Sequence, residues 1–304
     1  MSRAHTARWW RRLAPYVFIS PFFILFAVFG LFPLLFSVLL SFNRWDIGSG
    51  LAGLHGVGLA NYAFLVLQDD WLRKALYNTL WIAVVAGVPQ HLVALPLAYY
   101  LHTRLRRWRN LVAGAYFVPF ITSTVAISLV FTTLFSREFG VVNALLPGPA
   151  IDWTAPQYTK WMIAFVVFWR YLGWNAVLYL SALQTIPKDL LEAAALDGAS
   201  PRRQFLHIVL PLLRPMIFFA VTLTIIGNLQ LFEEPFILTG GSNGSADSGL
   251  GGIDQAGMTL AMHLYWIAFT EGEFGTASAL AWLLFALIAA ATWLNKRLLG
   301  GDLR

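Results

Sequence analysis

The chain has 304 residues, of which 58% are hydrophobic and 12% are charged, about half the charged fraction of an ordinary soluble domain. With a mean hydropathy of +0.65, this composition excludes a disordered chain, a collagen-like repeat and an ordinary soluble enzyme, and it is typical of a polytopic membrane protein. The chain has no cysteine, so disulfides, thiolate nucleophiles and zinc–thiolate sites are excluded.

Six stretches nearly free of Asp, Glu, Lys and Arg are each long enough to cross a membrane, which takes about 20 apolar residues. They predict an all-α polytopic membrane protein, with six transmembrane helices in a single domain over residues 1–304. The predicted spans are about 15–41, 77–101, 111–136, 161–184, 215–239 and 274–295. The first stretch is too long for the apolar region of a signal peptide and lacks a cleavage site, so we expect an uncleaved span.

The Lys and Arg residues predict the orientation of these spans. Fifteen of the 21 fall on the side of the N-terminus and five on the other, so both termini are expected to be cytoplasmic. This distribution also explains the net charge of +6, and no nucleic-acid partner is expected. The outer loop 240–273 has no Lys or Arg, and its glycine-rich start, residues 239–252, is read as a flexible surface loop.

The longest inner loop, residues 185–213, predicts two short helices. Thr185 is expected to cap the first helix, which ends where Gly198 adopts the left-handed conformation. Ser200 is expected to cap the second helix, and Pro211 to help end it. From the residues alone, docking of this loop on another protein and resting on lipid headgroups are equally supported.

Several motifs resemble one family. The segment Glu192-Ala-Ala-Ala-Leu-Asp-Gly-Ala199, with Leu210-Pro211 downstream, resembles the EAA loop of importer permeases of the ATP-binding-cassette class. Other stretches resemble the carbohydrate branch of that family, the maltose, lactose and glycerol-phosphate type. These stretches are Gly58-Leu-Ala-Asn-Tyr62, Asn78-Thr79, Gly140-Val-Val-Asn143, Ala182–Asp189 and Leu238-Thr-Gly-Gly241. The resemblance covers nearly the whole chain and is weakest at residues 242–257, where the loop is longer than usual.

The resemblance implies that the inner loop is a coupling helix seated in a cytoplasmic ATPase. The implied ATPase-contact residues are Glu192, Ala193, Ala194, Asp197, Gly198 and Ala199. The sequence has no Gly-x-x-x-x-Gly-Lys-Ser/Thr motif, so we expect no enzyme activity and no cofactor or metal on this chain, with ATP and magnesium on a partner. The implied setting is a bacterial inner membrane and its lipid. The implied partners are a second permease subunit, two ATP-binding-cassette subunits and an extracytoplasmic solute-binding protein.

A sugar path needs hydrogen-bonding groups and aromatic faces inside the bundle. In the family, the spans flanking the coupling loop line this path. We therefore expect Tyr171, Trp174, Thr224, Asn228 and Gln230 to line it here, although helix periodicity points Gln230 away from Asn228. The alternative is ordinary polar contact between transmembrane helices.

Charged and titratable groups inside spans are costly and therefore informative. Glu233 and Glu234 are expected either to line an outer vestibule or to lie at the outer interface, and Arg170 is expected to pair with one of them. His91 has no partner at helical spacing, so a hydrogen-bonded structural role is expected. The rival to an ATP-driven sugar importer is a stand-alone secondary sugar transporter or channel, although no internal repeat is evident.

Overall fold

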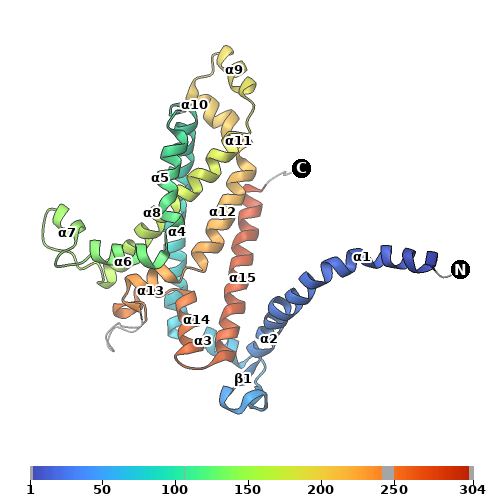
Figure 1. The fold of residues 1–304 in the computed structure, drawn as a ribbon. Coiled ribbons are helices and arrows are strands. Elements are labelled where there is room, and N and C mark those ends of the chain that lie inside the picture. The colour runs from blue at the N-terminus through green and yellow to red at the C-terminus, as the bar shows by residue number, and fades with distance from the viewer. Residues whose placement is uncertain (1–2, 106, 242–249, 301–304) are drawn as a thin grey trace. The chain divides into compact units, whose positions relative to one another are not determined.

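The computed structural model describes residues 3–105, 107–241 and 250–300, and it is almost entirely helical (Figure 1). Among these residues, four helices are long and apolar enough to cross a membrane, and two bent pairs of helices meet the same test when each pair counts as one span. The predicted all-α membrane fold is therefore confirmed. The chain forms two compact units, residues 1–68 with 267–282 and residues 69–266 with 283–304.

The first unit begins with one long apolar helical stretch in three parts. These are α1 (Arg3–Phe26), the π-turn η1 (Ala27–Leu31) and α2 (Phe32–Ser41). Pro33 lacks the N–H that would bond the carbonyl of Phe29, and the wider π-turn accommodates that missing bond without a break.

A short hairpin follows in the same unit. Strands β1 (Asn43–Trp45) and β2 (Leu54–Gly56) pair antiparallel around the 3-10 turn η2 (Ile47–Gly53), and α3 (Ala60–Leu67) comes next. The buried Asn61 amide donates to the carbonyls of Ser41 and Asn43, which fixes α3 to the end of α2 and the start of β1.

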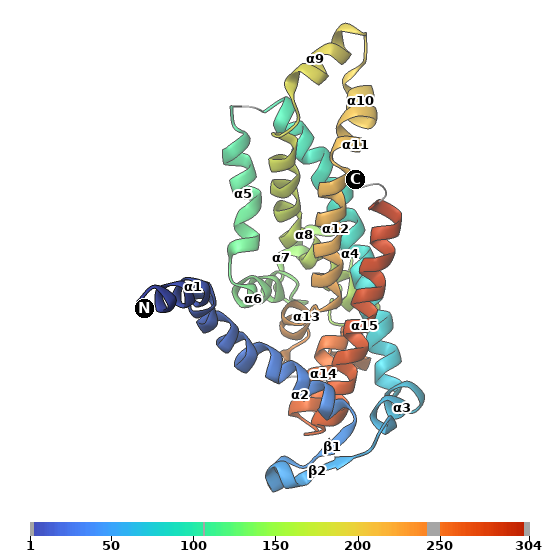
Figure 2. The ribbon, with the colours of Figure 1, turned by 90° about the vertical axis from the view of Figure 1, so that its right-hand side faces the viewer.

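The second unit is built around α4 (Asp70–Thr103), α5 (Arg109–Ile121) and α8 (Pro156–Leu183) (Figure 2). Helix α8 packs against both of the others, and its buried face includes Ile163 and Tyr179. A Cβ at Gly173 would overlap the Tyr116 carbonyl, so only glycine permits this close approach of α5 to α8.

The third predicted span, 111–136, is not one helix. Helix α5 stops at Ile121, and α6 (Thr124–Leu134) leaves it at 92°. Thr122 is extended, with ψ of 149°, and the Ser123 hydroxyl accepts the N–H of Ala126 as the cap of a new helix. The expectation of one continuous helix was therefore wrong at this point, although the bent pair together is long and apolar enough for one span.

The fifth predicted span, 215–239, also differs. Helix α12 (Arg214–Leu229) ends at Leu229, and α13 (Glu233–Leu238) begins only after a break at residues 230–232. The hydroxyl of Thr259 donates to the carbonyl of Leu231 at 2.7 Å, which satisfies a backbone group that the break exposes.

The outer segments contain more structure than expected. They form α7 (Val141–Leu145), the 3-10 turn η5 (Ile253–Gln255) and α14 (Leu260–Phe269), which precedes the last long helix α15 (Phe274–Leu299). Much of residues 256–268 is buried, so this part of the expected outer loop packs into the fold. Residues 242–249 of the glycine-rich segment lie outside the described residues.

Candidate functional site

The predicted coupling helix is α9 (Lys188–Leu196), and its C-terminus is closed as the sequence predicts. Gly198 has φ of +81°, the left-handed conformation that favours glycine. The N–H of Gly198 bonds the Ala195 carbonyl, and that of Ala199 bonds the Ala194 carbonyl. This pair of bonds is the Schellman closure, so α9 ends in a fixed turn.

The rest of the inner loop corrects two expectations. Thr185 does not cap α9, since its hydroxyl donates back to the Ala182 carbonyl. Ser200 does accept the N–H of Arg203, but the helix that follows does not end at Pro211. It runs through α10 (Pro201–Gln204), the π-turn η3 (Phe205–Val209) and α11 (Leu210–Leu212), because the π-turn accommodates the missing proline N–H. It then meets α12 at 69°.

The tip of the loop presents an exposed surface. In both ribbon views α9 lies beyond the ends of α5 and α8 in the second unit (Figures 1 and 2). Glu192, Ala193, Asp197 and Gly198 are exposed, whereas Ala194 and Ala199 are half-buried. Leu196 is 90% exposed, a residue that the sequence reasoning missed. The available signal was the helix spacing. The residues three and four positions before Leu196 are Ala193 and Glu192, so no large apolar side chain lies beside the leucine on α9.

The two aromatic residues expected in the sugar path belong to one ring cluster. Trp174 stacks on Phe120 at 4.4 Å between centroids, and Tyr171 meets Phe120 edge-on at 5.7 Å. Phe117 extends the cluster, with its ring centroid 6.0 Å from that of Trp174 and 5.6 Å from that of Phe120. Both Tyr171 and Trp174 are half-buried, so their rings retain some accessible surface beside α5.

The three polar residues expected to line the path from α12 lie in three different environments. Asn228 is buried and donates to the Ala83 carbonyl of α4 at 3.3 Å. Thr224 lies one turn away and lines an apolar cavity of about 390 Å³ with Gly87 and His91 of α4. Gln230 is exposed at the end of α12, as helix periodicity predicts.

A buried polar network, not anticipated from the sequence, joins α4 to α8. The Gln90 amide donates to the Val167 carbonyl at 3.2 Å, and Asn175 donates to the Gln90 side-chain oxygen at 3.3 Å. The next residue of α4, His91, shares a hydrogen bond of 2.7 Å with the hydroxyl of Tyr179 of α8, which confirms that it is hydrogen-bonded as expected.

Arg170 forms the predicted ion pair with Glu234. The guanidinium of α8 bonds the carboxylate of α13 at 2.5 Å, with both side chains more than nine-tenths buried. Arg170 also donates to the carbonyl of Thr122, at 3.5 Å. One cation therefore contacts both helix breaks, the one after α5 and the one before α13. Glu233, the neighbouring acid, is exposed.

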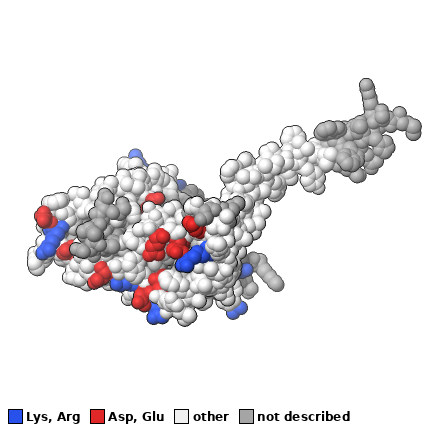
Figure 3. All heavy atoms as spheres, turned by 90° about the horizontal axis from the view of Figure 1, so that it is seen from below, with Lys and Arg blue, Asp and Glu red and all other residues white. Residues whose placement is uncertain are grey.

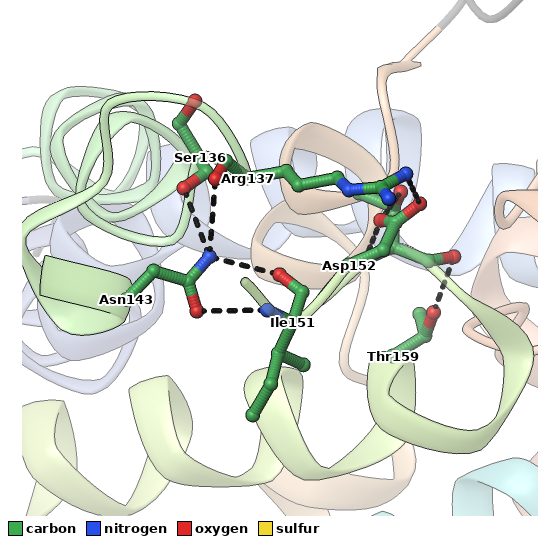
Figure 4. A network of polar contacts seen from close by, with 7 residues as sticks. Ser136, Arg137, Asn143, Ile151, Asp152 and Thr159 are labelled. Atoms are coloured by element: carbon green, nitrogen blue, oxygen red, sulfur yellow. Dashed lines mark hydrogen bonds and ion pairs between the residues drawn. The ribbon is translucent and has the colours of Figure 1, made fainter. Parts of the chain in front are cut away.

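Two asparagines from the motifs that carried the resemblance hold loops in place. Asn143 donates to the carbonyls of Ser136 and Ile151 and accepts from the Ile151 N–H (Figure 4). It also accepts from the Trp153 indole. Asn78 donates to the carbonyls of residues 255 and 258, at 3.0 Å each. These residues therefore shape the segments that precede α8 and α14.

One hydrogen-bonded pair of titratable side chains ties the start of α4 to α14. Asp69 caps α4, and its carboxylate bonds the His263 imidazole at 2.6 Å. Burial raises the pKa of the Asp69 carboxyl. The hydrogen bond from His263 and the charge of its imidazole lower this pKa, and so do the N–H groups of Leu72 and Trp71. The net result is a pKa below the ordinary value of 3.8 for this carboxyl. Figure 3 shows the molecule from below, where both acidic and basic side chains are exposed.

The chain matches known proteins along nearly its whole length. It is 33% identical to the arabinooligosaccharides transport system permease protein AraP of Bacillus subtilis, over 95% of this chain and 90% of that protein. It is 33% identical to the lactose transport system permease protein LacF of Rhizobium radiobacter, over 92% of each chain. A solved bacterial ABC transporter involved in the import of the acidic polysaccharide alginate has the same fold, with a TM-score of 0.80, 18% identity, and coverage of 98% of this chain and 100% of that one. Residues 56–299 match one family, and the chain belongs to it: the binding-protein-dependent transport system inner membrane components.

Proposed function

We propose that this chain forms half of the translocation pathway of an ATP-driven importer of di- or oligosaccharides. The similarity to permeases named for arabinooligosaccharides and lactose supports the sugar class. A second permease subunit completes the pathway, a solute-binding protein delivers the sugar from outside, and both termini are cytoplasmic, in agreement with the distribution of Lys and Arg.

The observation that carries the proposal is the closed and exposed helix α9. Its contact residues are Glu192, Ala193, Ala194, Asp197, Gly198 and Ala199, and we add Leu196. A leucine that is 90% exposed at the tip of a rigid helix gains about 2 kcal/mol when a partner buries it. The partner is the cytoplasmic ATPase, which hydrolyses ATP with its own magnesium, while this chain hydrolyses nothing and holds no cofactor.

For the sugar path, the ring cluster around Tyr171 and Trp174 supplies apolar faces for the C–H surfaces of a sugar. Thr224, Asn228 and Gln230 supply hydrogen-bonding groups. Of these, Asn228 already bonds the Ala83 carbonyl and Gln230 is exposed at the end of α12, so we propose Tyr171 and Trp174 as the principal contacts.

The test is co-purification of the ATPase with the tagged permease in mild detergent. Gly198→Arg should abolish it, since an arginine there meets the left-handed backbone penalty, about 1 kcal/mol, and obstructs the interface. Gly58→Arg is the matched control: Gly58 has φ of +58° and equally open space around its Cα, but lies in the first unit. Leu196→Ser should weaken ATPase binding about tenfold or more. Full ATPase recovery with Gly198→Arg would refute α9 as the contact. Purification of the permease without any ATPase in both forms, together with solute uptake that needs no ATP, would instead establish the secondary-transporter alternative.

A further inference from the structure

Two lysines near the starts of α4 and α8 form a basic and aromatic cluster in the second unit. The Lys160 ammonium lies 4.4 Å from the centroid of the Tyr77 ring and 5.6 Å from that of Trp81. Trp161 packs edge-on against Trp81 at 4.8 Å. Lys74 is close enough for its charge to act on Lys160. The aromatic rings thus hold Lys160 in place beside a second positive charge.

Neither lysine is neutralised by an acid within the part of the chain that the structure describes. The ion pairs between described residues involve other cations. Lys74 donates instead to the neutral side chain of Gln255, at 3.3 Å. Two adjacent ammonium groups repel each other, and an anion between them removes that repulsion and gains attraction to both.

The cluster lies near the starts of two helices that are long and apolar enough to cross a membrane. Each lysine is four residues into its helix, about 6 Å along the axis from the helix start. Tyr77 and Trp161 are 58% and 57% exposed, which is typical of aromatic side chains at a membrane interface. Further along the two helices the exposed side chains become purely apolar, with Val84 on α4 and Phe165 on α8.

We propose that Lys74, Lys160, Tyr77 and Trp161 bind the phosphate of an anionic phospholipid, at the ends of α4 and α8 remote from the coupling loop. The lysines hold the phosphate, the aromatic rings contact the glycerol region, and the acyl chains lie along the exposed apolar side chains. The continuity of the basic cluster with an apolar surface selects a lipid over a soluble anion. The inference is independent of the sugar path and of the ATPase contact.

The experiment is native mass spectrometry of the purified, fully assembled transporter titrated with phosphatidylglycerol or phosphatidylcholine. The wild type should bind a first phosphatidylglycerol more tightly than phosphatidylcholine. A basic residue near an anionic headgroup contributes about fivefold in affinity, so Lys74→Gln with Lys160→Gln should weaken the binding of phosphatidylglycerol about thirtyfold. Phosphatidylcholine should bind equally to both forms. Arg73→Gln is the matched control, a neighbouring exposed cation outside the cluster, and should change neither affinity.

Equal affinity of the wild type and the double variant for phosphatidylglycerol would overturn the proposal. Displacement of the lipid by an equal concentration of soluble glycerol phosphate would overturn it too, since the site would then recognise a free anion. Loss of the second permease subunit from the double variant would assign this face to the contact between permeases. If the double variant does not fold, Lys74→Gln alone, at an exposed position, should still weaken binding about fivefold.

Discussion

Removal of one partner of the Arg170–Glu234 pair should destabilise the permease strongly. Both side chains are more than nine-tenths buried, so Glu234→Leu leaves a guanidinium whose remaining described hydrogen bond, to the Thr122 carbonyl, is long at 3.5 Å. An uncompensated buried charge of this kind costs about 3–5 kcal/mol, and Arg170→Met should cost a similar amount for the stranded carboxylate. Replacement of both by the two apolar residues should cost at most about 1–2 kcal/mol, since no buried charge remains.

The assay is equilibrium unfolding of the purified permease in mixed micelles, followed by tryptophan fluorescence, for both single variants and the double variant. The cycle should return a coupling energy of about 4 kcal/mol or more, because the single costs would sum to about 6–10 kcal/mol. Glu233→Leu is the matched control: Glu233 is adjacent and exposed, so its replacement should change stability by less than about 0.5 kcal/mol. A cost below about 1 kcal/mol for Glu234→Leu would refute the argument that the pair is desolvated.

Two further variants test the packing and the charge of the second unit. Gly173→Ala should lower the free energy of unfolding by about 2 kcal/mol or more in the same assay, because the new Cβ would overlap the Tyr116 carbonyl. Gly114→Ala on α5 is the control: open space surrounds that position, so the change should be neutral or stabilising. The Asp69–His263 pair should stabilise the fold above pH 3.8 and lose this contribution as pH falls through the lower pKa of folded Asp69. In a plot of the unfolding midpoint against pH, Asp69→Asn should remove the loss of stability that the wild type shows at acidic pH. A plot unchanged by the substitution would contradict the depressed pKa of Asp69.

Composition and local signals predicted part of this structure well. The apolar runs predicted the all-α membrane fold, glycine chemistry predicted the closure at Gly198, and the cost of charge in a span predicted the Arg170 pair. The breaks after Ile121 and Leu229 were missed because hydropathy measures how apolar a segment is and carries no information about its direction. Ser123 was a usable signal for a new helix start, since serine is a preferred capping residue.

The buried helix α14 was missed for a different reason. Its ten residues are too few to span a membrane, and the loop around it was interpreted from its glycines and acids. An apolar run of that length is typical of a buried or interfacial segment, which is how the structure uses it. The sugar path was the least predictable part. An amide such as that of Asn228 forms the same kind of hydrogen bond to a neighbouring helix as to a sugar hydroxyl, and here it bonds the Ala83 carbonyl.

The Asn143 cluster has a consequence for molecular recognition. One side chain makes hydrogen bonds to backbone groups from Ser136 to Ile151, so the segment between α6 and α8 is already shaped before any partner arrives. A protein that docks on this segment meets a preorganised surface. The encounter then carries little of the entropic cost of ordering a loop, and a larger share of the contact energy appears as affinity.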